Sequence, residues 1–173
     1  MKKIILLVAL TLCCSFSAFS QKYGYIDSEY ILGNIPEYKE AQKELDRIAA
    51  NWQKEIEKKF ASIDSMYKKY QVEAITLPEN LKQKREDDIV KAEQDAKDLQ
   101  KKRFGKDGDL FKKREELVKP IQDRVFNAIE ALAKDRGYAF VFDAAGSMTI
   151  VYADPKFDLN DQVMQRLGIS VKQ

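Results

Sequence analysis

The side chains that most often perform enzymatic chemistry are nearly absent from this chain. Its 173 residues include no histidine and only two cysteines, Cys13 and Cys14. Without histidine, no imidazole can act as a general acid or base or bind a metal ion. No phosphate-binding GxxxxGK[ST] or GxGxxG pattern occurs in the sequence. We therefore expect no enzyme activity and no cofactor.

Two groups of carboxylates are the remaining candidates for a site. Asp87 and Asp88 are adjacent within a charged helical run, where the simplest interpretation is solvated surface. The Asp107-Gly108-Asp109 segment has the composition of a calcium loop, but it lacks the DxDxDG spacing and the terminal glutamate. The sequence therefore predicts no metal site.

The first twenty residues have the features of a secretory signal. Lys2 and Lys3 precede an apolar run over residues 4–12, and small residues, Ala18 and Ser20, precede a predicted cleavage site before Gln21. No later segment has the roughly 18 apolar residues of a membrane span. We predict an exported protein with residues 1–20 removed.

Both cysteines lie within this predicted signal, so the mature chain would have none. Lipidation remains the alternative, although neither Cys13 nor Cys14 follows the small residue that a lipoprotein signal requires. An exported protein without disulfides must be stabilised by packing or by association.

The charge of the predicted mature chain is balanced, with 28 basic and 28 acidic side chains. Dense but balanced charge is typical of solvated helix faces and argues against nucleic-acid binding. Between Lys97 and Arg114 the local charge reaches +5. This stretch is a candidate for weak contact with a membrane surface.

A long helix is predicted after a short strand and a short helix. The strand covers residues 22–27, Ser28 caps a helix over residues 29–35, and Pro36 begins the next element. From residue 37 to residue 75 there is neither glycine nor proline, and apolar residues recur at helical spacing. Such a helix would reach roughly 58 Å and must project from any core of this size.

The chain then turns and returns as a second helix. Thr76 and Glu79 are spaced as a capping box around the tip, with Pro78 in the first helical turn. The returning helix extends to Arg136, and Gly137 follows it as a terminating glycine. Its apolar stripe is thin in the middle, where alanines and isolated leucine or isoleucine residues predominate.

Two glycines, Gly105 and Gly108, interrupt the returning helix, with Phe104 and Phe111 on either side. We predict a hinge there that widens a cavity, and the alternative is a harmless surface irregularity. If both sites are helical, alanine at each should stabilise the fold, by up to about 2 kcal/mol together.

Strands return at the end of the chain. Residues 138–142 predict a buried strand, residues 144–147 a turn and residues 148–152 a further strand. Asp158 or Asn160 then caps a helix that ends at Gly168.

The predicted fold class is α+β and mostly α, a coiled-coil hairpin projecting from a small β body. Its parts are the signal peptide (residues 1–20), the body (residues 21–35 and 137–173) and the hairpin (residues 36–136) with a tip near residues 76–79. A body of about 50 residues is marginally stable alone, so association through strand edges is expected. The predicted interface consists of Tyr25, Phe140, Phe142 and Ile150.

The hairpin carries more apolar surface than the thin returning stripe covers. Part of it is therefore expected to be a weak, non-directional binding face for apolar segments. The predicted residues are Trp52, Ile56, Phe60, Ile63, Tyr67, Tyr70, Phe104 and Phe111.

The layout resembles the Skp/OmpH family of periplasmic chaperones. The matching segments are YGYIDSEYIL at residues 23–32, KPIQ at 119–122, GYAFVFD at 137–143, and YAD at 152–154 with DLND at 158–161. The resemblance implies a homotrimer whose strands share one body and whose hairpins surround a cavity for unfolded outer-membrane proteins. Members are often strongly basic, and the neutral mature chain weighs against lipopolysaccharide or anionic-lipid contacts.

The resemblance implies an ATP-independent holdase chaperone. The alternative is a structural periplasmic coiled-coil spacer or adaptor of an envelope complex. Client binding separates the two, because a holdase suppresses aggregation of an unfolded barrel protein without nucleotide and a spacer does not.

Overall fold

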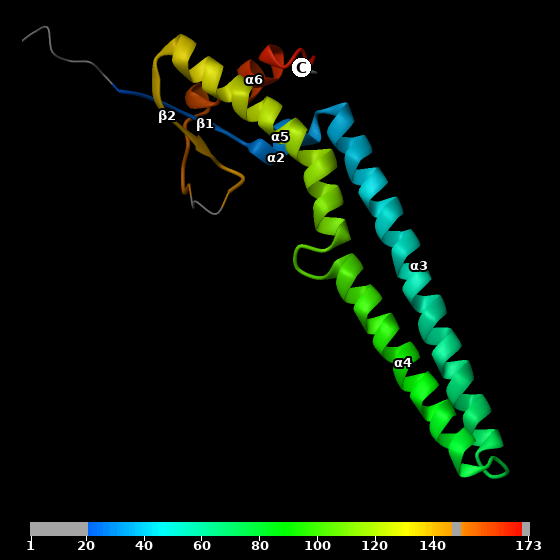
Figure 1. The fold of residues 1–173 in the computed structure, drawn as a ribbon. Coiled ribbons are helices and arrows are strands. Elements are labelled where there is room, and N and C mark those ends of the chain that lie inside the picture. The colour runs from blue at the N-terminus through cyan, green and yellow to red at the C-terminus, as the bar shows by residue number, and fades with distance from the viewer. Residues whose placement is uncertain (1–20, 147–149, 171–173) are drawn as a thin grey trace, which may run out of the picture. The chain divides into compact units, whose positions relative to one another are not determined.

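Helices dominate the computed structural model, which describes residues 21–146 and 150–170 (Figure 1). The elements in chain order are β1 (Lys22–Ile26), α2 (Ser28–Gly33), α3 (Pro36–Glu73), α4 (Glu79–Phe104), α5 (Asp109–Arg136), β2 (Tyr138–Asp143), the 3-10 helix η1 (Pro155–Phe157) and α6 (Asn160–Arg166). The predicted α+β, mostly helical fold class is confirmed. The predicted signal peptide, residues 1–20, lies outside the described residues.

The chain forms two compact units, one comprising residues 32–125 and the other the segments before and after them. We call the first the hairpin unit and the second the body. Their boundary falls within α5, so the last part of this helix belongs to the body.

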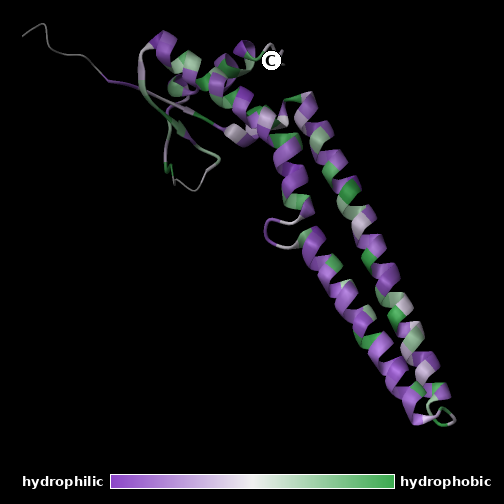
Figure 2. Ribbon diagram, in the orientation of Figure 1, coloured by the Kyte–Doolittle hydropathy of each residue, from purple (hydrophilic) through white to green (hydrophobic). Residues whose placement is uncertain are grey.

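In the hairpin unit, α3 and α4 lie side by side and run in opposite directions (Figure 1). Pro36 occupies the first turn of α3, where its missing N–H leaves no bond unmade. The residues of these two helices that face the interior follow the predicted stripe: Ala41, Leu45, Ile56 and Ile63 on α3, and Ile89 and Ala96 on α4. Figure 2 shows how few hydrophobic positions α4 contributes.

The tip connects α3 to α4 without the predicted capping box. The Thr76 hydroxyl instead donates to the carbonyl of Glu73, at 3.1 Å, and so satisfies the end of α3. Pro78 precedes α4, and no side-chain cap begins that helix. The Thr76 hydroxyl could have capped either helix. It donates to a carbonyl that would otherwise have no partner at the end of α3.

The returning helix is two helices, α4 and α5, separated at residues 105–108. This interruption is sharper than the bend that the glycine pair predicted. At the far end of α5 Gly137 has a φ of +68°, which confirms it as the terminating glycine.

In the body, β1 and β2 pair in parallel, which brings the two ends of the described chain together. The backbone N–H of Leu159 donates to Tyr25 O at 2.9 Å, and the N–H of Asp27 donates to the buried Asn160 side chain at 2.7 Å. The segment before α6 therefore covers one edge of β1. Gly24 permits this approach, because a Cβ there would lie 2.5 Å from Leu159 Cδ1.

The helix ends of the body differ partly from expectation. Asp27, rather than Ser28, caps α2, because its carboxylate accepts the N–H of Tyr30 at 2.8 Å. At the end of α6, Gly168 has a φ of +76° and its N–H donates to Gln165 O. The N–H of Ile169 donates to Met164 O, which completes a Schellman motif and confirms Gly168 as the stop.

Two predictions for the closing strands are corrected. Strand β2 forms, but it is not buried, because most of its side chains are exposed. The predicted strand over residues 148–152 is absent from its described part, residues 150–152, and residues 147–149 lie outside the description. The hydrophobic composition of these segments predicted buried strands, but the described part of a single chain does not bury them.

The close packing at Gly24 provides a stability test. Gly24→Ala should lower the free energy of unfolding by about 1–3 kcal/mol, since the new methyl would press on Leu159 and Tyr138. Urea denaturation measures this change. Gly33→Ala is the matched control, because a Cβ there meets nothing within 4 Å. Equal stability of the two variants would contradict the packing described for β1.

Candidate functional site

The far part of the hairpin exposes several large apolar side chains that the thin α4 stripe does not cover. Of the residues predicted for the binding face, Phe60 and Tyr67 on α3 are about two-fifths exposed. Trp52 and Tyr70 are half-buried, while Ile56 and Ile63 are buried, at 2% and 6% exposure. Ile56 and Ile63 thus belong to the packed interior in this structure, and the accessible face is narrower than the stripe.

The packing between the two helices is held by few residues. Ile63, Ile89 and Ala96 form a small core, against which Met66, Tyr70 and Ala92 pack. Most of the remaining α4 surface is charged, so there is little apolar area to cover α3. The partial exposure of Phe60 and Tyr67 follows from this shortage.

Two tyrosines of α3 bond to glutamates of α4 beside this core. The Tyr67 hydroxyl donates to Glu93 at 2.8 Å, and the Tyr70 hydroxyl donates to Glu86. These hydrogen bonds raise the pKa of both phenols, because ionised tyrosine would lose its donor and face a carboxylate. Each ring therefore has an anchored polar end and an apolar body.

The tip and the neighbouring part of α4 carry further exposed apolar residues. Ile75 is 89% exposed and Val72 77%, and Leu81 and Val90 on α4 are also exposed. Val72, Ile75 and Val90 lie off the apolar stripes of their helices, so a search for apolar residues outside the helical period would have found them. We refer to the exposed apolar side chains of this region collectively as the distal apolar surface: Phe60, Tyr67, Val72, Ile75, Leu81 and Val90.

The body presents a second apolar surface, an aromatic ladder of Tyr23, Phe140 and Phe142. The rings of Tyr23 and Phe140 stack with centroids 5.9 Å apart, and those of Phe140 and Phe142 with centroids 6.3 Å apart. Phe140 is 54% exposed. These rings stand on one face of a two-stranded sheet, and all three are partly exposed.

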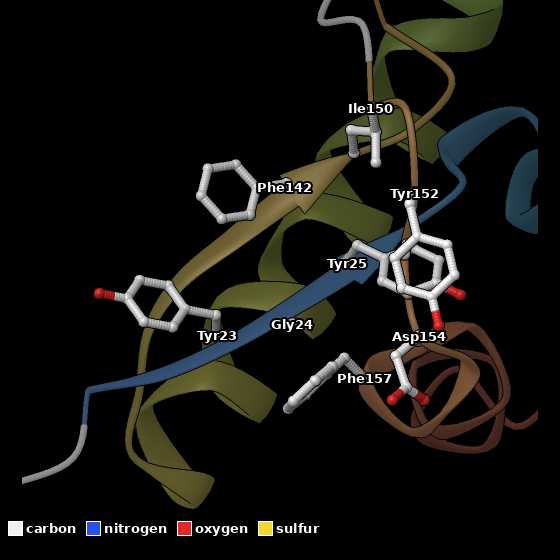
Figure 3. A pocket seen from close by; sticks show the side chains of 9 residues that line it. Tyr23, Gly24, Tyr25, Phe142, Ile150, Tyr152, Asp154 and Phe157 are labelled. Atoms are coloured by element: carbon white, nitrogen blue, oxygen red, sulfur yellow. The ribbon is translucent and has the colours of Figure 1, made fainter.

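Beside the ladder lies a cavity of about 420 Å³ (Figure 3). It is formed by β1, the end of β2 and the segment that precedes α6. The lining residues are Tyr23, Gly24, Tyr25, Phe142, Ile150, Tyr152, Ala153, Asp154 and Phe157. Three of the four predicted interface residues, Tyr25, Phe142 and Ile150, thus meet at one place, and Phe140 stacks on Phe142.

The predicted hinge residues form a defined turn between α4 and α5. The N–H of Gly105 donates to Lys101 O at 2.8 Å, and the N–H of Gly108 donates to Gly105 O at 2.9 Å. Between them Asp107 has a φ of +59°, in the left-handed region. Phe104 and Phe111 flank the turn and are both exposed, and the Phe104 ring meets Trp52 edge to face.

The basic stretch from Lys97 to Arg114 is partly neutralised by neighbouring acids. Lys97 lies 3.9 Å from Glu93, and Lys113 lies 2.6 Å from Glu116. Such exposed pairs contribute little to stability, but they lower the positive potential of the surface. Membrane-surface contact through this stretch stays a prediction.

Nothing in the described chain adds a chemical centre. Within residues 21–146 and 150–170, no three histidine, cysteine, aspartate or glutamate side chains gather as a metal site. No described helix is long and apolar enough to cross a membrane.

Comparison with known proteins gives a family match over most of the chain. Residues 22–167 match the sequence profile of the family described as outer membrane protein (OmpH-like). The chain belongs to the OmpH-like family. Membership supports, at the level of the family, a non-enzymatic chaperone of outer membrane proteins that works in the periplasm.

Two further comparisons give a similar sequence and a similar fold. An uncharacterised protein of Aquifex aeolicus (strain VF5) is 28% identical over 167 residues, covering 96% of each chain. A crystal structure from Caulobacter crescentus CB15, described as a candidate OmpH-like outer membrane chaperone, superposes with a TM-score of 0.67. That match covers 85% of this chain and 83% of the other at 13% identity, so it shows the OmpH-like fold.

The turn between α4 and α5 reverses the expected effect of alanine. A Cβ at Gly105 would lie 2.3 Å from Lys101 O, and one at Gly108 would lie 2.8 Å from Gly105 O and from Lys102 O. Because these are backbone atoms, Gly105→Ala/Gly108→Ala should lose about 1–3 kcal/mol of stability instead of gaining it. Thermal unfolding measures the sign, and a more stable double variant would show that residues 105–108 are helical in solution.

Proposed function

We propose that this OmpH-like chain is an ATP-independent holdase of the periplasm that binds unfolded outer-membrane proteins and prevents their aggregation. The observation that carries the proposal is the distal apolar surface on the hairpin unit. The family assignment supplies the class of client, and the exposed side chains supply a means of holding it.

The chemistry of the distal apolar surface suits a client without fixed structure. Its members project from α3, the tip and α4, and each offers an apolar contact without a directional bond. Weak contacts of this kind tolerate many sequences and release the client readily. Exposed charged side chains between them keep the surface soluble.

Self-association through the body supports the proposed homotrimer. The outer edge of β2 has no partner strand in the described chain, and the aromatic ladder beside it is exposed. Unpaired edges and stacked exposed rings favour pairing with another chain. In a trimer, hairpins held at one end would surround a cavity in which the distal apolar surfaces hold the client.

Removing the apolar tip should weaken client binding without unfolding the protein. Val72→Ser/Ile75→Ser/Leu81→Ser should reduce protection of an unfolded outer-membrane β-barrel protein by about tenfold, because each substitution removes exposed apolar area that the client would bury. Light scattering during dilution of the barrel protein from urea measures protection as the concentration of chaperone required.

Gln71→Ser/Asn80→Ser provides the control, because it alters the same tip without removing apolar side chains. Neither ATP nor a chelator should change protection at constant ionic strength. Full protection by the tip variant would refute the proposed surface. Absence of protection by the unaltered protein would instead favour the structural spacer.

The aromatic ladder should hold the oligomer together. Phe140→Asp should convert a trimer to monomers, because the carboxylate would have to be buried in the interface. Light scattering coupled to size exclusion measures the mass. Phe126→Asp is the matched control, since Phe126 is also exposed in the body but lies outside the ladder. A folded monomer before any substitution would contradict the proposed association.

A further inference from the structure

Arg103, near the end of α4, contacts three residues on two other helices of the hairpin unit at the turn between α4 and α5. Its guanidinium bonds across the turn to Asp109, the first residue of α5, with Nη1 2.8 Å from Oδ2. Its Nη2 lies 3.5 Å from a carboxylate oxygen of Glu55 on α3. The same group lies over the ring of Trp52, 4.6 Å from the centroid.

These contacts are unlike the other charged pairs of the hairpin unit. Most of those join residues three or four positions apart on one helix and are well exposed. Arg103 and Asp109 are only about a quarter exposed, so their attraction is less screened by water and salt. A planar guanidinium can stack and hydrogen-bond at once, which an ammonium group cannot do.

The turn itself does not hold α5 in one direction. Its backbone bonds lie within residues 101–112, and it includes Asp107 in the left-handed region. Arg103 joins α4 to the start of α5 and to α3 at once, so it is placed to fix the angle between them. Its Nε is buried without a hydrogen-bond partner among the described residues. This N–H donor makes no hydrogen bond while Arg103 holds its contacts with Asp109, Glu55 and Trp52. Breaking those contacts therefore costs less free energy than it would if every donor of Arg103 were bonded.

We propose that Arg103 is a positioning residue, a clasp that sets the direction of α5 against α3 and α4. When the Arg103 contacts break and the clasp opens, the turn at Gly105 and Gly108 becomes the hinge between α4 and α5. The consequence for clients rests on the proposed function: an opened clasp would let the client cavity widen. Two separate readouts therefore distinguish the clasp from the chaperone activity.

Distances between spin labels test the clasp directly. One label on α3 at Glu57 and one on α5 at Glu115 are introduced as cysteines in an otherwise cysteine-free full chain. The unaltered protein should give a narrow distance distribution. Both Arg103→Gln and Asp109→Asn should at least double its width, and Arg103→Lys should give an intermediate width because it keeps the charge but loses the stacking.

A second pair of labels, at Ser65 on α3 and Asp95 on α4, reports the packed hairpin away from the turn. Its distribution should not change in any variant. Lys113→Gln, which removes an exposed pair with Glu116, should leave both distributions unchanged. An unchanged width between residues 57 and 115 in both clasp variants would overturn the proposal. Equal broadening of both label pairs would also overturn it, because the helices would then be separating as a whole.

Client protection supplies the independent readout. Asp109→Asn should change the ratio of protection between a large and a small unfolded barrel protein at least twofold, in favour of the large one. A widened distance distribution with an unchanged ratio would leave the clasp standing and overturn its role in client size. If the unaltered chain protects neither protein, the proposed function fails while the distance result still decides the clasp.

Discussion

The narrow apolar seam between α3 and α4 is the constraint on which the rest of the hairpin depends. Two long helices meet through a few buried side chains, with Ile63, Ile89 and Ala96 at the centre of the distal part. Because α4 supplies so little apolar area, α3 cannot bury all of its own. Polar contacts make up part of the difference, as when Tyr67 and Tyr70 bond to glutamates of α4. Phe60 and Tyr67 therefore stay partly uncovered, so the same shortage that limits the packing exposes part of the proposed binding face.

The body shows a comparable shortage of cover. Its buried residues include Ile26 on β1 and Leu159, Val163 and Met164, and the Leu159 side chain lies against Gly24 on one side of the sheet. The other side has the aromatic ladder and the cavity beside it, with Phe140 more than half exposed. A second chain would cover these rings and pair the free edge of β2. Association and client holding would thus both use apolar surface that one folded chain leaves exposed, in different parts of the molecule.

Sequence periodicity predicted the elements well and their surroundings less well. Pro36, Gly137 and Gly168 marked helix ends because proline and left-handed glycine have few other compatible positions. Burial was harder, since the composition of β2 predicts a core strand whether its cover comes from the same chain or another. The contacts of Arg103 were not predictable, because Arg103 is distant in sequence from Glu55 and Trp52 and nothing in their types marks them as partners. The hydrogen bond of Thr76 was also not predictable, because its hydroxyl could have capped either α3 or α4.

The distal apolar surface should contact an unfolded client. Photo-crosslinking tests it most directly, with a photoreactive amino acid placed at Ile75 in the exposed tip or at Lys58 on the charged face of α3. In the presence of an unfolded outer-membrane β-barrel protein, the account predicts crosslinks to the client from position 75 and at most a background level from position 58. Equal crosslinking from both positions, or none from position 75 while the client remains protected from aggregation, would contradict it.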